Sequence, residues 1–275
     1  MRIGFAGAGN MGGAIIKGYT SSGAAADNGD SIFVYDSDAE KTEALAAQGL
    51  SINIAGSLAE LAGASEAIAL CVKPNVMGDV LGELARILKE QTDSRLYISI
   101  AAGISIAYIQ GLLGAGAKVV RVMPNTPAMV GEGMSAMSAS EGLSDEDKAA
   151  AERLFGAVGK AVWVPENQMD AVTGISGSSP AYAYLYIEGL VRAGVEEGLP
   201  VEAATIMAAQ STLGAAKMVL ENLGQTEPRQ LCVNVCSPGG TTIEAVKALE
   251  AAGFTDTVCK AAKASAAKSK LMTKK

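Results

Sequence analysis

The stretch "RIGFAGAGNMGGAI", residues 2–15, decides the fold. An apolar run typical of a strand is followed by Gly7, Gly9 and Gly12 in the spacing GxGxxG, and then by a helical pattern. In such a unit the first glycine makes the turn, the second lets the backbone approach a pyrophosphate, and the third lets helix and strand pack closely. Free amides at the helix N-terminus favour phosphate. We therefore predict a dinucleotide-binding loop; the alternative is a tight turn without a ligand.

Short apolar runs and helical patterns alternate over the rest of the first half. This alternation predicts a parallel, doubly wound sheet of the Rossmann-like α/β class. Three of its helices are expected to begin with a capping box, at Ser37…Glu40, Ser57…Glu60 and Ser144…Asp147. We place this dinucleotide-binding domain at residues 1–165. The predicted strands are 2–6, 31–35, 50–54, 67–72, 96–100, 119–123, 134–138 and 161–164.

The second half of the chain has a different pattern, because no strand-like run follows Trp163. We expect an all-α domain at residues 166–275. Its helices are rich in alanine and apolar on several faces, which is typical of helices that pack against another subunit. The tail from Lys260 holds six lysines and no acid, which favours a solvated helix end over a binding patch. The predicted helices are 180–198, 201–224, 241–253 and 255–272.

Composition argues against several classes of protein. The 275 residues carry a formal charge of −7, which argues against a nucleic-acid partner, and 49% of them are hydrophobic, as in a packed globular protein. No run reaches the roughly 18 apolar residues of a membrane-spanning helix. The N-terminus lacks the pattern of a signal peptide. We therefore expect a cytoplasmic protein with no membrane partner.

Four cysteines without CxxC spacing and a complete lack of histidine restrict the chemistry. A zinc site would need all four thiolates or added carboxylates. We expect no metal site and favour buried free thiols in a reducing compartment. Because the chain has no imidazole, any general acid or base must be another group.

Asp36 ends the second predicted strand, where an acidic side chain can accept hydrogen bonds from both ribose hydroxyls of a dinucleotide. It would also repel a 2′-phosphate, so we expect a mild preference for NADH over NADPH, although Lys41 is close enough in sequence to reach a phosphate. The alternative role of Asp36 is to cap the following helix. Asn125 lies between two prolines after the sixth strand and either contacts the nicotinamide or satisfies its own turn.

Motifs in both halves together resemble those of pyrroline-5-carboxylate reductase. They are "FAGAGNMG" (5–12), "VKP" (72–74), "AAG" (101–103), "RVMPNTP" (121–127), "TGISGSSPAY" (173–182) and "NVCSPGGTT" (234–242). The resemblance covers nearly the whole chain. It implies reduction of the cyclic imine 1-pyrroline-5-carboxylate by NADPH or NADH to L-proline, the last step of proline biosynthesis. It also implies a Rossmann domain followed by a helical dimerisation domain, in a homodimer that often builds larger rings.

The resemblance also implies which residues form the site. Ser179, residues 232–235 and Asp36 depart from the usual family pattern, which bears on the pocket and on the choice of coenzyme. Substrate contacts are expected at Glu166, Ser237, Gly240, Thr241 and Thr242. Coenzyme contacts are expected at Ala6, Gly7, Ala8, Gly9, Asn10, Met11, Asp36, Ser37, Val72, Lys73, Ala101, Ala102 and Asn234. Pro74 and Asn125 lie in loops at strand ends and are candidates for the same role.

The stretch "SPGGTT" (237–242) places two adjacent glycines directly before the start of a predicted helix. Thr241 and Glu244 have capping-box spacing, which predicts a helix that starts at Thr242 and leaves nearby amides without intrahelical partners. We predict that these amides bind the carboxylate of the substrate. A glycine-rich cap without a ligand is the alternative.

The proton of the imine has three candidate sources. It arrives on the substrate, from Thr173, or from a water held by Glu166. The segment 173–180 either lines the pocket or forms a bent helix start with Ser179 as N-cap and Pro180 as the first helical residue. The rival functions are another two-domain dehydrogenase, such as a different cyclic-imine reductase or a β-hydroxyacid dehydrogenase, and a non-catalytic dinucleotide-binding sensor.

Overall fold

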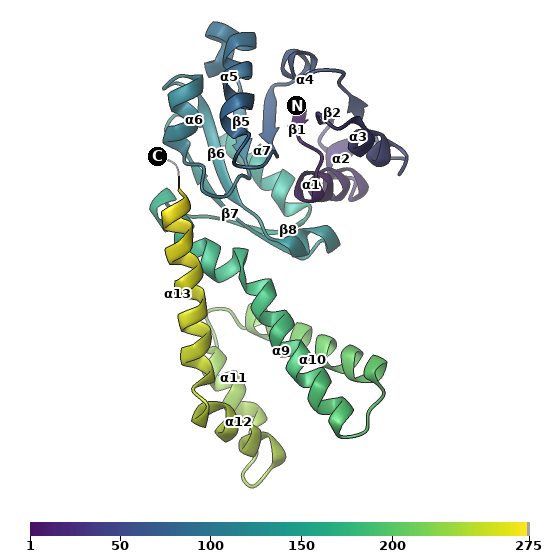
Figure 1. Cartoon of the computed structure of the whole chain (residues 1–275), viewed down its shortest axis with the longest axis vertical. Helices are drawn as coiled ribbons and strands as arrows, with labels where there is room; N and C mark the ends of the chain where they lie inside the picture. Colours follow the sequence, from purple (N-terminus) through teal and green to yellow (C-terminus); the bar gives the residue numbers. More distant parts are fainter. Residues whose placement is uncertain (274–275) are drawn as a thin grey trace. The chain divides into compact units, whose positions relative to one another are not determined.

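The computed structural model describes residues 1–273, which form two compact units. The first unit comprises Met1–Ser178 and the C-terminal segment from Lys263, and the second comprises Ser179–Ala262 (Figure 1). The first unit is therefore discontinuous in sequence. Lys274 and Lys275, which end the basic tail and the predicted domain 166–275, lie outside the described residues.

An eight-stranded sheet in the order β3-β2-β1-β4-β5-β6-β7-β8 forms the centre of the first unit. All eight predicted strands are present, which confirms the α/β class. β1 lies between β2 and β4, so the chain builds outward from β1 first on one side and then on the other, as in a doubly wound sheet. The strands are β1 (Arg2–Ala6), β2 (Ser31–Tyr35), β3 (Asn53–Ile54), β4 (Ala67–Leu70), β5 (Leu96–Ser99), β6 (Lys118–Met123), β7 (Gly133–Ala139) and β8 (Gly159–Trp163).

The expectation of a wholly parallel sheet is wrong at one place, because β7 runs antiparallel to β6. Only residues 124–132, with the short 3-10 helix η2 (Thr126–Val130), connect the two strands. A parallel neighbour needs a crossover of about a dozen residues or more, so the short connection turns the chain back. β8 follows the helix α7 (Asp145–Gly156) and runs parallel to β7.

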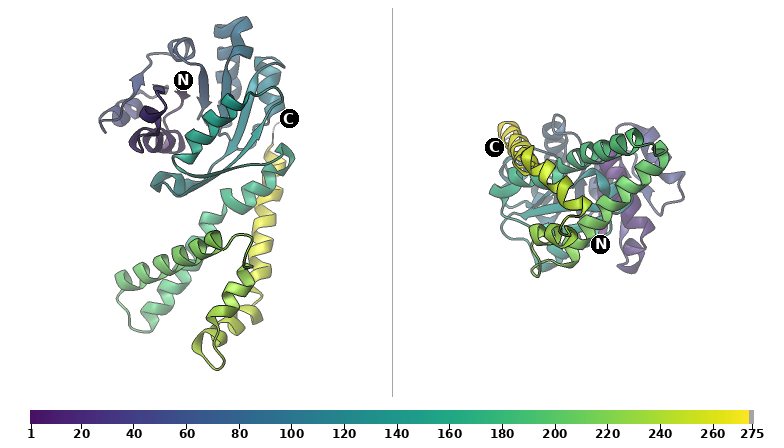
Figure 2. Two further views of the ribbon diagram at one scale, coloured as in Figure 1. Left: turned by 180° about the vertical axis from the view of Figure 1, so that it is seen from behind. Right: turned by 90° about the horizontal axis from the view of Figure 1, so that it is seen from below.

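Helices cover both faces of this sheet (Figure 2). α1 and α7 pack on one face, in an apolar cluster that includes Ile16 and Phe155. α4, α5 and α6 pack on the other, in a cluster that includes Leu61 and Ile109. The helices not yet given are α1 (Asn10–Ser21), α2 (Ala24–Asp27), α3 (Ala39–Ala46), α4 (Leu58–Ala64), α5 (Met77–Leu88), η1 (Lys89–Ser94), α6 (Ile106–Leu113), η3 (Glu166–Gln168), α8 (Met169–Val172) and the π-turn η4 (Thr173–Gly177).

The three predicted capping boxes have different outcomes. The box at Ser144 is complete and is confirmed. Ser57 accepts the amide of Glu60 at 3.1 Å, but Glu60 takes the amide of Gly56 in return, so this box is only half formed. The prediction at Ser37 is wrong, since α3 begins at Ala39 and no side chain caps it.

The second unit is helical throughout, as predicted, and none of the described residues after Trp163 lies in a strand. Its helices are α9 (Ser179–Glu196), α10 (Val201–Glu221), α11 (Pro228–Val235), α12 (Thr241–Ala251) and the start of α13 (Phe254–Met272). α9 already contains Ser179, so Ser179 is not an N-cap. α11 was not predicted, because eight residues are too few to establish a helical repeat. α9 and α10 approach closely at Gly194, where a Cβ would lie 3.1 Å from that of Ala204.

Large apolar side chains remain exposed on the second unit, including Leu185 at 68%, Ile206 at 62% and Met207 at 58% exposure. Exposed apolar surface of this extent is typical of a protein interface. The four cysteines are free thiols, but Cys259 is exposed, which contradicts the expectation that all would be buried. Among residues 1–273, no helix has both the length and the apolar character needed to cross a membrane.

Candidate active site

The three glycines of the first loop play three different structural roles. Gly7 has a φ of +106°, and a Cβ there would lie 2.7 Å from the carbonyl oxygen of Cys71. A Cβ on Gly12 would lie 2.5 Å from the carbonyl oxygen of Gly7. Gly9, in contrast, has nothing within 4 Å of its Cβ position, and it is the N-cap of α1 with no side-chain cap. The loop therefore presents open backbone and free amides at Gly9, which fits a pyrophosphate.

Two clefts of the first unit share Val72, at the carboxyl ends of β1 and β4, where the order in which strands are added to the sheet reverses. Ligands of such sheets bind at this point. The wide cleft measures about 520 Å³, and its lining includes the predicted coenzyme residues Gly9, Asn10, Met11, Val72, Lys73, Pro74, Ala101 and Ala102. The narrow cleft measures about 220 Å³, and its lining includes the predicted residues Ala6, Gly7, Asp36, Ser37 and Val72. Residues predicted to contact the coenzyme therefore line both clefts.

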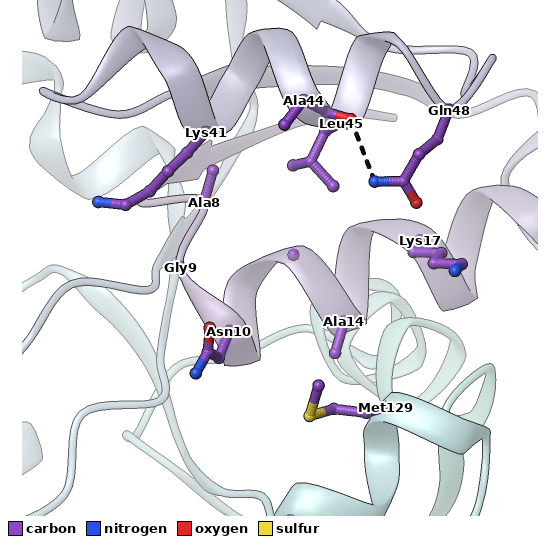
Figure 3. Close-up of a pocket in the computed structure, with 11 residues that line it drawn as sticks. Ala8, Gly9, Asn10, Ala14, Lys17, Lys41, Ala44, Leu45, Gln48 and Met129 are labelled. Carbon is purple, nitrogen blue, oxygen red and sulfur yellow. Dashed lines mark hydrogen bonds between the residues drawn. The ribbon is translucent and has the colours of Figure 1, made fainter.

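A third pocket of about 350 Å³ lies between α1 and α3 beside the glycine loop (Figure 3). Ala8 lines this pocket and neither of the two clefts. Lys17 on α1 and Lys41 on α3 also line it, and Lys41 reaches the wide cleft as well. The amide of Ala8 points to Asp36, so Ala8 contributes to the shape of the loop.

Asp36 is held by three groups. Its Oδ2 accepts the amide of Ala8 at 2.8 Å, its Oδ1 accepts the amide of Asp38 at 2.9 Å, and Lys41 Nζ lies 3.4 Å from Oδ1. Burial by itself would raise the pKa of Asp36, but the two amides and Lys41 outweigh it and hold the pKa below its ordinary value. The carboxylate thus ties the second strand to the glycine loop. Its bond to Asp38 also explains why the helix starts after Ser37.

Asn125 serves its own loop. Its side chain is buried, its Nδ2 donates to the carbonyl of Ser176 at 3.0 Å, and its Oδ1 accepts the amide of Met134 at 2.8 Å. Asn125 does not line either cleft. Of the two roles left open for it, the geometry favours the one of holding the turn.

Glu166 and Thr173, the candidates for proton delivery, are both engaged within the first unit. Glu166 Oε1 accepts the amide of Ile106 at 2.8 Å and lies 3.0 Å from Arg121 Nη1. Glu166 therefore fastens the start of α6 to β6. The Thr173 hydroxyl donates to the carbonyl of Met169 at 3.0 Å. The Thr173 proton is therefore already used in a hydrogen bond to the backbone.

The predicted carboxylate cradle lies in the second unit, between α11 and α12. Gly239 has a φ of +70°, and a Cβ on Gly240 would lie 2.3 Å from the hydroxyl of Ser237. α12 begins at Thr241 with Gly240 as N-cap, so the prediction that Thr241 caps a helix starting at Thr242 is wrong by one residue. The reason is that Gly240 is already in the extended conformation of an N-cap. No side chain caps α12, so its first amides remain available.

The other predicted site residues divide between the units. Ser237, Gly240, Thr241 and Thr242 lie together in one turn of the second unit, and Asn234 lies just before them on α11, where its Oδ1 accepts Gln230 Nε2 at 2.8 Å. Glu166 and Thr173 belong to the first unit.

Sequence reasoning missed several residues that shape the clefts. Met123 and Ile100 line the wide cleft, and Leu58 and Val76 line the narrow one. Met123 and Ile100 lie at or directly after the ends of predicted strands, which was the available signal. The partner of Glu166 was also missed: Arg121 is a charged residue inside the apolar strand "VVRVM" (119–123).

Comparison with known proteins agrees with this geometry. A family model described as "Pyrroline-5-carboxylate reductase dimerisation" matches residues 166–272, and one described as "NADP oxidoreductase coenzyme F420-dependent" matches residues 2–103. The pyrroline-5-carboxylate reductase of Escherichia coli (strain K12) is 42% identical over 260 residues, 94% of each chain. That of Pisum sativum is 39% identical over 269 residues, 98% of this chain and 94% of the relative.

Solved structures give the same result. A pyrroline-5-carboxylate reductase from Coxiella burnetii superposes with a TM-score of 0.89 at 34% identity, over 99% of this chain and 98% of that one. The pyrroline carboxylate reductase of Plasmodium falciparum with NADP bound superposes with a TM-score of 0.83 at 34% identity, over 100% and 98% of the two chains.

Proposed function

Since the chain belongs to the pyrroline-5-carboxylate reductase family, we propose that it reduces 1-pyrroline-5-carboxylate to L-proline with NADPH or NADH, as the last step of proline biosynthesis. The observation that carries the proposal is the open backbone at Gly9, which lines the wide cleft at the carboxyl ends of β1 and β4. When bound, the nicotinamide coenzyme supplies the hydride. The task of the protein is to hold both reactants in a reactive pose.

In this proposal the coenzyme lies along the two clefts. The amides at the start of α1 bind its pyrophosphate, the narrow cleft with Asp36 and Ser37 takes the adenosine end, and the wide cleft takes the nicotinamide end. Lys73 and Ala102 line the wide cleft and are proposed to flank the nicotinamide ring. Asn234 remains a proposed coenzyme contact.

The substrate carboxylate is proposed to bind at the start of α12. The amides of Thr241 and Thr242 and the hydroxyl of Ser237 form the cradle, and Gly240 leaves the backbone bare for a close approach. Glu166 and Thr173 stay proposed residues of the reaction site. Because the Thr173 hydroxyl already bonds to Met169, we favour the route in which the imine arrives protonated.

We also propose that the protein works as a homodimer, within a larger ring, formed through the helical part of the chain. The exposed apolar side chains of α9 and α10 support this. The proposed functional boundary lies at residues 165–166, where the dimerisation family model begins. The proposed setting is the cytoplasm, with neither nucleic acid nor membrane as a partner. Activity should fall on dilution below the dissociation constant of the dimer, and sedimentation of a fully active monomer would contradict the dimer.

The function is tested by following absorbance at the reduced nicotinamide band with purified protein. Oxidation should require 1-pyrroline-5-carboxylate, and amino-acid analysis should find L-proline. A related dehydrogenase would turn over a different substrate, and a sensor would bind coenzyme without turnover. Absence of proline at high enzyme concentration would reject the proposed reaction.

A further inference from the structure

The end of α13 carries three hydroxyls that all meet one segment of the first unit. Ser265, Ser269 and Thr273 are four residues apart and so lie along one face. Ser269 Oγ donates to Asp170 Oδ1 at 2.6 Å, and Thr273 Oγ1 donates to the same oxygen at 3.3 Å. Ser265 Oγ lies 2.8 Å from Ser178 Oγ. This face of α13 is therefore bound to residues 170–178, beside which it lies in Figure 2.

Ser269 is the centre of the contact, with only 9% of its surface exposed. Its short bond to the carboxylate of Asp170 is charge-assisted, which makes it the strongest of the set. Its Oγ also lies 3.4 Å from Thr173 Oγ1. Ser269 thus holds both α8 and the first residue of the π-turn. Such turns are frequent at functional sites.

The held segment reaches the wide cleft by two routes. A Cβ on Gly177, the last residue of the π-turn, would lie 2.7 Å from Met123 Cε, and Met123 lines the cleft. A Cβ on Gly103 would lie 3.0 Å from the carbonyl oxygen of Met272. The loop that contributes Ala102 to the cleft therefore backs directly onto the last turn of α13. The end of α13 supports two parts of the cleft wall.

We propose that Ser269 and Asp170 are positioning residues of the coenzyme site, which hold the wall of the wide cleft in place for the nicotinamide ring. Neither lines either cleft, so they act through Met123 and the loop at Gly103. Met123 and Ala102, which lie where these contacts reach the wall, line the wide cleft and not the narrow one. Their influence is thus confined to one end of the coenzyme. This rests on the proposed function in one respect, that the nicotinamide end occupies the wide cleft.

The test compares NADH with ADP-ribose, which has the same adenosine and pyrophosphate but no nicotinamide. Dissociation constants for both are measured by calorimetry with Ser269→Ala and Asp170→Asn. We expect the constant for NADH to rise about five- to tenfold, because a wall displaced by a fraction of an ångström misplaces the ring. The constant for ADP-ribose should stay at the wild-type value. Ser269→Thr keeps the hydroxyl and should restore NADH binding.

Thr257→Ala is the matched control, since the Thr257 hydroxyl on α13 bonds only to the carbonyl of Gly253 at 3.0 Å. It should change neither constant. Thr273→Ala removes the longer bond to Asp170 and should give a smaller effect in the same direction, which keeps the test possible if Ser269→Ala does not fold. Equal weakening of both ligands, or no change in either, would overturn the proposal. Failure of the wild type to bind ADP-ribose would instead reject the proposed coenzyme site.

Discussion

Substitution of alanine for Gly9 or for Gly12 should distinguish an effect on coenzyme binding from an effect on the stability of the fold. Gly9 has a φ of −68° and nothing within 4 Å of its Cβ position, so Gly9→Ala fits the folded chain. We expect its stability to change by less than about 1 kcal/mol, because the entropic gain of a Gly→Ala change is opposed by the poor N-cap preference of alanine. At Gly12 the added Cβ would lie 2.5 Å from the carbonyl oxygen of Gly7 and 3.0 Å from Cys71 Cβ. Backbone must move there, and overpacking of this kind costs about 1–3 kcal/mol.

Coenzyme binding should be affected by Gly9→Ala more than by Gly12→Ala, which is the reverse of their order in stability. A methyl group on Gly9 fills the open space above the loop, where the pyrophosphate is proposed to approach. A hydrogen bond to a charged group contributes about 1.5–3 kcal/mol. Each factor of ten in a dissociation constant corresponds to about 1.4 kcal/mol. Loss of two such bonds should therefore raise the dissociation constant of NADH roughly a hundredfold or more.

The two variants are compared by calorimetric titration with NADH and by thermal unfolding. Gly12→Ala should lower the unfolding midpoint by about 2–4 °C for each kcal/mol lost, whereas Gly9→Ala should keep it. Gly63→Ala is the control, because Gly63 on α4 also has nothing within 4 Å of its Cβ position and lies outside the loop. If Gly9→Ala binds NADH as tightly as the wild type, the glycine loop does not hold the pyrophosphate.

Three further predictions concern other parts of the molecule. Thr242→Val removes a hydroxyl from the proposed cradle and should lower kcat/KM for the imine about ten- to a hundredfold without changing coenzyme binding. Thr241→Val should leave stability nearly unchanged, because Thr241 does not cap α12. Full activity of both variants toward the imine would exclude the cradle. Burial alone would raise the pKa of Asp147, but its capping-box bonds and Lys118 outweigh burial and hold the pKa below its ordinary value. Its contribution to stability is therefore present above about pH 3.9 and is lost as the pH falls through the folded pKa. Asp147→Asn should lower the unfolding midpoint at about pH 7 and much less at about pH 3, and an equal loss at both pH values would refute this linkage. The wild type should mildly favour NADH over NADPH in kcat/KM, and Asp36→Ser should shift the ratio toward NADPH; a wild type that clearly favours NADPH would show that Lys41 dominates.

The sheet could be predicted from sequence because its strands are buried. Runs such as "AIAL" (67–70), with every residue buried, leave a signal that needs no knowledge of their neighbours. The direction of β7 carried no such signal, since it depends on the length of the connection that precedes it. α11 was missed because its eight residues are too short a run to establish a helical repeat.

The site was predictable where local chemistry decides the geometry, and less so where distant residues do. The glycine loop needs only its own spacing and the strand before it. Asp36 was predicted to accept ribose hydroxyls or to cap the following helix, whereas its bond to the amide of Ala8, 28 residues earlier, was not predicted. The start of α12 was misplaced by one residue, because Gly240 and not Thr241 takes the extended conformation of the N-cap. Contacts of this kind arise only in the folded chain.

The split of the first unit into Met1–Ser178 and the segment from Lys263 has a consequence for synthesis. A chain that emerges from the ribosome folds its N-terminal part first. Here the sheet and its glycine loop are complete early, but the serine and threonine side chains that bind Asp170 and Ser178 emerge only after the whole second unit has been made. A nascent or prematurely terminated chain would therefore carry a coenzyme loop without the final support of its wide cleft. The wide cleft of the first unit therefore gains these contacts only once residues 265–273 have been made.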